Sequence, residues 1–174
     1  MKSLKGFFIV ILGLFIMVTL ISLLIPSTIR VTRGVVVRAP AAKVLEQLSD
    51  VNNWKNWHPV LRSDSIQYLK STKANSLEWE SNGKTNTFSI TSATANEIQA
   101  TLDREGELPV QNVLAILPLP DSSAVQVEWR ALIRLKWYPW EKFYGIFVEK
   151  ITGPGYEDAL NSLKAYMENP NREN

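Results

Sequence analysis

Few side chains in this sequence could act as an acid or a base. The only histidine, His58, lies in Trp57-His58-Pro59 at the expected end of a short helix, with no carboxylate or nucleophile at a recognisable catalytic spacing. We therefore expect a surface or capping histidine. Carboxylates that could point inward show no recognisable pairing, and most such residues are solvated; they are Glu46, Asp50, Asp103 and Glu105. The sequence predicts no catalytic residue.

Composition removes several classes of site. The chain has no cysteine, which excludes a disulfide, a thiolate metal site and a cysteine nucleophile, and a single histidine argues against a zinc site. No glycine-rich phosphate loop or dinucleotide fingerprint occurs. The 19 Lys and Arg against 17 Asp and Glu are scattered along the chain, which argues against nucleic-acid binding. We expect no metal, no cofactor and no nucleic-acid partner.

Aromatic residues are the better candidates for a site. Large rings supply much contact area and a few polar tips, which suits a hydrophobic small molecule or lipid. The residues that we expect to line a cavity are Trp54, Trp79, Phe88, Trp129, Tyr144, Phe147, Tyr156 and Leu160. For each of them the alternative is an ordinary place in the core.

The middle of the chain alternates between strand-like segments and turn signals, as in an antiparallel sheet. Residues 31–37 form the first alternating ribbon, and the segments that follow are 62–69, 75–81, 85–92, 96–105 and 110–117. The last strand, residues 125–137, has one apolar face and one mostly polar face. That apolar face requires a cover.

Helical patterns flank these strands. Pro40 can open a helix because the first turn does not need its N–H, and Asp50 can cap a second short helix that Pro59 ends. Near the C-terminus, apolar residues recur at helical spacing over residues 141–168, on both sides of Gly153-Pro154-Gly155. We expect a kink or break there, and a cavity between this helix and the apolar sheet face.

The N-terminal segment is long enough to cross a membrane. An apolar run begins at Phe7 and ends at Ile25, which as a helix spans about 28 Å, close to the hydrocarbon thickness of a bilayer. A cleaved signal peptide is the alternative, but it has a shorter apolar core and a small-residue cleavage site that residues 24–28 do not offer. We predict an uncleaved single-pass anchor.

Charges beside the apolar run hardly decide its orientation. Lys2 and Lys5 precede it, whereas Arg30, Arg33 and Arg38 follow it, so the count is nearly tied. We expect a short cytoplasmic N-terminus and an extracytoplasmic domain, as is usual for an N-terminal signal-anchor.

Several motifs together resemble the START-like (SRPBCC) superfamily. They are the helix start at Ala39-Pro40, Asp50 followed by Trp54 and Trp57, the Trp79-Glu80-Ser81-Asn82-Gly83 hairpin, and the stretch from Phe143 through Gly153-Pro154-Gly155 to Lys164. The subgroup that they resemble is the bacterial polyketide cyclase/dehydrase and lipid transport proteins, whose members often carry an N-terminal membrane segment. The resemblance covers about residues 29–168.

The resemblance implies an α+β helix-grip fold, in which a curved antiparallel sheet wraps around a long C-terminal helix and a hydrophobic cavity. The expected function is binding or transfer of a hydrophobic, lipid-like molecule by a membrane-anchored domain. Two alternatives stay open: a cyclase or aromatase-type enzyme, and a protein-interaction module with a filled core.

Three regions follow from these patterns. Residues 1–27 form the anchor, 28–168 the START-like domain and 169–174 a polar tail. About 145 residues suffice for a self-standing core, so we expect residues 30–174 to fold without the anchor.

Overall fold

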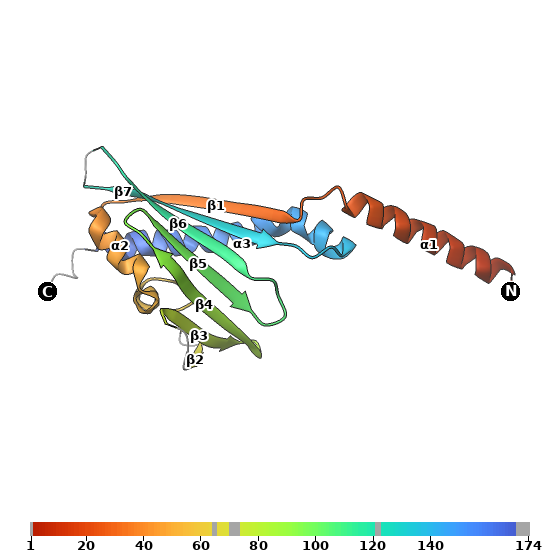
Figure 1. Ribbon diagram of the computed structural model, residues 1–174, viewed down its shortest axis with the longest axis horizontal. Helices are drawn as coiled ribbons and strands as arrows, with labels where there is room; N and C mark the ends of the chain where they lie inside the picture. Colours follow the sequence, from red (N-terminus) through yellow and green to blue (C-terminus); the bar gives the residue numbers. More distant parts are fainter. Residues whose placement is uncertain (1, 64–65, 70–73, 121–122, 170–174) are drawn as a thin grey trace.

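A curved antiparallel sheet and one long helix dominate the computed structural model, which describes residues 2–63, 66–69, 74–120 and 123–169 (Figure 1). The elements are α1 (Lys2–Ser22), β1 (Thr28–Val37), α2 (Ala41–Ser49), the 3-10 helix η1 (Val51–Asn56), β2 (Gln67–Leu69), β3 (Ser76–Ser81), β4 (Lys84–Ala93), β5 (Glu97–Arg104), β6 (Val110–Pro118), β7 (Val125–Arg134) and α3 (Pro139–Met167). The α+β helix-grip arrangement expected from the sequence is confirmed.

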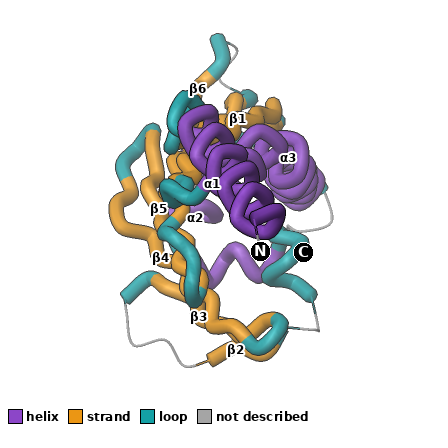
Figure 2. The backbone as a smooth tube through the Cα atoms, turned by 90° about the vertical axis from the view of Figure 1, so that its right-hand side faces the viewer, coloured by secondary structure: helices purple, strands orange, loops and turns teal. Residues whose placement is uncertain are grey.

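The strands lie in the order β1-β7-β6-β5-β4-β3-β2. Strands β2 to β7 thus form a meander in which sequential strands are neighbours, and β1 adds to its edge beside β7. Strand β1 pairs with β7 from Thr28 opposite Arg134 to Val37 opposite Val125. Helix α3 packs against β1, and Figure 2 shows the strands curving around from this helix towards β2. The long pairing places the start of the domain beside its last strand and last helix.

Turn residues fix the β3–β4 hairpin. Asn82 and Gly83 both have positive φ, 53° and 69°, as a two-residue turn of the Asn-Gly type requires. This register places Leu77 opposite Phe88, and both side chains are buried.

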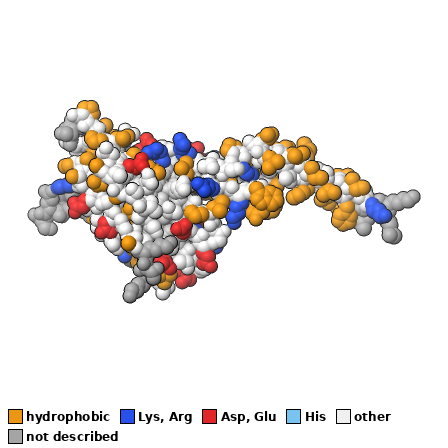
Figure 3. All heavy atoms as spheres, in the orientation of Figure 1, with side chains coloured by type: hydrophobic (Ala, Val, Ile, Leu, Met, Phe, Trp, Pro, Cys, Tyr) orange, Lys and Arg blue, Asp and Glu red, His pale blue; other side chains and the backbone are white. Residues whose placement is uncertain are grey.

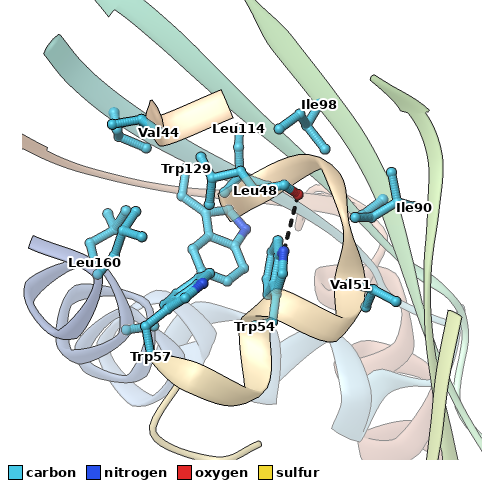
Figure 4. Packing of buried hydrophobic residues seen from close by; sticks show 14 of the residues in the cluster. Val44, Leu48, Val51, Trp54, Trp57, Ile90, Ile98, Leu114, Trp129 and Leu160 are labelled. Atoms are coloured by element: carbon cyan, nitrogen blue, oxygen red, sulfur yellow. Dashed lines mark hydrogen bonds between the residues drawn. The ribbon is translucent and has the colours of Figure 1, made fainter. Parts of the chain in front are cut away.

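Short helices α2 and η1 close one end of the curved sheet. The Asp50 side chain accepts a hydrogen bond from the Asn52 N–H over 2.9 Å, so the predicted cap is confirmed. The indole N–H of Trp54 donates to the Leu48 carbonyl over 3.0 Å and ties η1 back to α2 (Figure 4). Trp54 is thereby held inside the sheet's curve.

Strand boundaries differ most from expectation in β1, which begins at Thr28 and not at residue 31, in β2 and in β7. In the segment predicted as a strand over 62–69, β2 begins only at Gln67, and residues 64–65 lie outside the described residues. Strand β7 ends at Arg134, not at residue 137, although the Leu135 N–H still donates to the Ser27 carbonyl over 2.8 Å, in continuation of the register with β1. Residues 170–174 of the expected tail also lie outside the described part.

Of the kink or break predicted at Gly153-Pro154-Gly155, the break is wrong, since α3 is helical without interruption from Pro139 to Met167. Pro154 is exposed, and a proline within a helix removes one backbone hydrogen bond. Val148 before it and Leu160 after it are both buried, so tertiary packing holds the helix on each side of the proline.

Candidate ligand-binding cavity

A cavity of about 560 Å³ lies between the sheet and α3. Its wall comprises Trp54, His58, Val60, Leu61, Trp79, Phe88, Leu102, Arg104, Gly106, Glu107, Leu108, Val110, Asn112, Trp129, Ile133, Arg134, Leu135, Lys136, Glu141, Tyr144, Val148, Ile151, Thr152, Gly155 and Tyr156. Most of the wall residues are apolar or aromatic, and the charged ones belong to the β5–β6 loop region, the end of β7 with the residues just after it, and the start of α3. This distribution is typical of a site for a hydrophobic molecule with a polar end.

Aromatic rings form the inner wall. Trp54 lies with its ring centroid 4.6 Å from that of Phe88 and 5.4 Å from that of Trp129, the second contact edge to face. Tyr156 on α3 meets Trp129 edge to face at 5.1 Å. Figure 4 shows Trp54, Trp57 and Trp129 converging from η1 and the sheet, with Leu160 of α3 on the far side. The rings therefore connect all the layers of the domain.

One buried amide faces this wall. Asn112 on β6 is 2% exposed, and its Oδ1 accepts a hydrogen bond from the Trp129 indole N–H over 3.0 Å. Its Nδ2 donates to the Val110 carbonyl over 3.1 Å. Asn112 thus fixes the Trp129 ring plane.

His58 also belongs to the wall, which corrects the expectation of a surface or capping histidine. Its ring stacks on Trp54 at 5.9 Å and lies 6.0 Å from Trp129, and its buried Nδ1 has no hydrogen-bond partner among the described residues. Burial lowers the pKa of His58 from 6.5 to about 4. Near pH 7 this imidazole is neutral and a weak base.

Tyr156 brings a phenol into contact with these rings. Burial raises the pKa of Tyr156, and the charge of Arg104 opposes that rise without cancelling it. Arg104 itself pairs with Glu107 over 3.6 Å in the loop after β5. The wall therefore offers a neutral imidazole, a protonated phenol and a fixed amide.

The structure brings six of the eight expected site residues to the cavity. They are Trp54, Trp79, Phe88, Trp129, Tyr144 and Tyr156, of which Tyr144 is half exposed at the rim. Phe147 and Leu160 lie elsewhere. Phe147 is 56% exposed, because Tyr144 and Val148 occupy the side of α3 that faces the cavity. Leu160 is 1% exposed and lies within the main hydrophobic core.

Sequence reasoning missed Asn112, and it misplaced His58. Asn112 lies on the same buried face of β6 as Val110 and Leu114. A polar residue among inward-facing apolar ones was the signal from which its place in the site could have been predicted. For His58 there was no such signal, because its place depends on how η1 packs into the curve of the sheet.

Comparison with known proteins identifies the family. Residues 28–168 match the family described as polyketide cyclase / dehydrase and lipid transport. A START superfamily protein from Mycobacterium smegmatis is 19% identical, with a TM-score of 0.59 over 80% of this chain and 97% of the other. The Zhui aromatase/cyclase from Streptomyces sp. R1128 is 17% identical, with a TM-score of 0.58 over 83% and 96%. No curated protein matches.

The fold and cavity define a START-like helix-grip protein. The chain belongs to the polyketide cyclase/dehydrase and lipid transport family, as its sequence motifs indicated. Identities below 20% establish the shared fold and not a shared ligand. In the described part of the chain, one helix is also long and apolar enough to cross a membrane, over Lys5–Ser22.

Proposed function

We propose that this protein binds a hydrophobic, lipid-like small molecule in the cavity beneath α3, while α1 anchors the domain to a membrane. The observation that carries the proposal is the aromatic-walled cavity itself. Its volume of about 560 Å³ falls within the usual range for small-molecule sites, about 300–1,000 Å³.

The position of the cavity rim supports a link with the membrane. Tyr144 on α3 and Leu108 in the β5–β6 loop are partly exposed wall residues at the end of the sheet from which α1 leaves. Lys136 joins the two sides of this rim, since its Nζ donates to the Gly106 carbonyl over 3.3 Å. Val60, beyond η1, is a further exposed wall residue.

The two other functions fit the site less well. A protein-interaction module with a filled core would leave no space of this size between sheet and helix. A cyclase would need an acid or base matched to neutral pH, whereas burial makes His58 a weak base and Tyr156 a weak acid. Binding without chemistry requires neither group to titrate.

Native mass spectrometry of full-length protein released from mild detergent tests the proposal. We expect an adduct that extracts into organic solvent. Gly155→Leu is the blocking variant, because Gly155 belongs to the wall and a Cβ there meets nothing within 4 Å. We expect this variant to lose most of the adduct.

Glu157→Leu is the matched control, since it adds the same side chain at an exposed position of α3 outside the wall. It should retain the adduct. Two outcomes would refute binding in this cavity. One is an adduct on both variants, and the other is the absence of an adduct from both variants and from the parent protein after incubation with total membrane lipid. Conversion of the extracted molecule by the purified protein would favour the cyclase alternative.

A further inference from the structure

Aromatic residues at the start of α3 are exposed although the domain has a large core. Trp137 and Trp140 are each 66% exposed and Tyr144 is 50% exposed. The Tyr138 ring is stacked on that of Trp140 and tilted against that of Trp137, with its centroid 5.0 Å from each. We call Trp137, Tyr138, Trp140 and Tyr144 the aromatic cluster. Exposed apolar patches of this kind usually mark a contact surface.

A buried lysine fixes this cluster beside the end of α1. Lys142, 4% exposed, donates from Nζ to the Ile25 carbonyl over 2.9 Å and also to the Ser27 hydroxyl. The Leu135 N–H donates to the Ser27 carbonyl over 2.8 Å, on the other side of the cluster. The segment that leaves α1 is therefore attached to α3 by two hydrogen bonds and to Leu135, just after β7, by a third.

These attachments set the depth of the cluster relative to a bilayer that α1 crosses. The apolar stretch Lys5–Ser22 rises about 27 Å as a helix, close to the hydrocarbon thickness, so Ile25 lies about one turn beyond it. Trp140 lies two residues from the lysine that binds Ile25. The cluster is then at the level of the lipid headgroups, a layer of about 5–7 Å on each side.

We infer that the aromatic cluster docks into the headgroup region of the bilayer and holds the cavity rim against the membrane. Trp and Tyr favour this layer because each has an apolar body and a polar tip. Figure 3 shows hydrophobic side chains continuing from α1 to the junction with the domain, where Lys and Arg side chains border them. The occupant of this surface is lipid, since the surface is continuous with the membrane-spanning helix.

Docking at this depth gives the cavity a direct source of ligand. Tyr144 belongs both to the cluster and to the wall, and it lies about 6 Å along α3 from Trp140. An amphiphile leaving the headgroup layer would reach the rim without crossing bulk water. The inference rests on the proposed anchoring by α1, but it does not require a ligand in the cavity.

Tryptophan fluorescence of the full-length protein in phosphatidylcholine nanodiscs tests the inference. The other four tryptophans, Trp54, Trp57, Trp79 and Trp129, are at most 7% exposed. Quenching by lipids brominated high on the acyl chain should therefore report Trp137 and Trp140. We expect the brominated lipids to quench part of the tryptophan emission, and we expect water-soluble acrylamide to quench this same part only weakly. The double substitution Trp137→Phe, Trp140→Phe should abolish the quenching by lipid.

A distal reporter provides the control. Val36→Trp, placed in the Trp137→Phe, Trp140→Phe background, lies on an exposed position at the far end of β1 and should be quenched by acrylamide alone. Acrylamide quenching of Trp137 and Trp140 without lipid quenching would overturn the inference, and so would shielding from both quenchers, which indicates a protein partner. Loss of the full-length protein from the nanodiscs would overturn the anchoring as well, whereas absence of a ligand adduct would bear only on the proposed function.

Discussion

The indole N–H of Trp129 donates to the Oδ1 of Asn112 over 3.0 Å across neighbouring strands β7 and β6. Both side chains are almost fully buried, and both belong to the cavity wall. A buried polar pair of this kind orients one ring of an otherwise apolar wall, because an unpaired indole N–H would carry the full cost of its lost hydration.

Asn112→Leu should destabilise the protein by about 1–3 kcal/mol, because the Trp129 N–H loses its acceptor. The cost should shrink in a Trp129→Phe background, where no N–H remains to be satisfied. Urea unfolding of all four proteins in mild detergent measures the coupling. Asn86→Leu is the control, since Asn86 bonds locally to the Lys84 carbonyl and its cost should not depend on residue 129. Additive effects at 112 and 129 would contradict the expectation.

Stability should fall as the pH decreases from about 6.5 to about 4. The unfolded chain gains a proton on His58 near its ordinary pKa of 6.5, whereas burial delays protonation in the folded protein until about 4. His58 therefore leaves the free energy of unfolding unchanged above pH 6.5, and lowers it by about 3 kcal/mol by pH 4.

Carboxylates also titrate in this pH range, so the effect of His58 must be measured as the difference between the parent protein and a variant without the histidine. Chemical unfolding of the parent protein and of His58→Gln at several pH values isolates the contribution of His58 to the free energy of unfolding. His58→Gln should show the shallower decline below pH 6.5. Parallel curves would show that His58 protonates as readily in the folded protein as in the unfolded chain.

Two glycines of α3 should respond oppositely to alanine. A Cβ at Gly155 meets nothing within 4 Å, so Gly155→Ala should gain up to about 1 kcal/mol from helix propensity. A Cβ at Gly145 would lie 2.2 Å from Leu135 Cδ1 and 3.0 Å from Ile29 Cδ1, so Gly145→Ala should cost about 1–3 kcal/mol through overpacking. Thermal unfolding of the pair measures both; equal shifts would refute this close approach of α3 to the sheet.

A chain that begins at Thr28 should fold but be less stable than one that begins at Leu23. The shorter chain lacks the Ile25 and Ser27 oxygens that Lys142 binds, which leaves a buried ammonium unpaired at a cost of about 1–3 kcal/mol or more. Urea unfolding compares the two chains. Lys142→Met should stabilise the shorter chain relative to its parent and give no such gain in the longer one. Equal stability of the two parents would count against a structural role for these bonds.

The sequence by itself determined the elements and the fold class. Alternation along residues 125–134, the Asn82-Gly83 turn and the Asp50 cap are local signals, and each depends on backbone preferences that act within a few residues. The apolar run of α1 is equally local. Such signals indicated a sheet, its covering helix and a membrane-length segment without any knowledge of packing.

Tertiary structure alone decided the membership of the cavity wall and the course of α3. Helical spacing placed Phe147 and Tyr144 on one stripe, but only the docking of α3 on β1 shows which side of that stripe faces inward. His58 enters the wall because η1 packs into the sheet's curve, and α3 continues through Pro154 because buried neighbours hold both flanks. These outcomes depend on contacts between residues far apart in the chain, whose free energy exceeds the local preferences that the sequence displays.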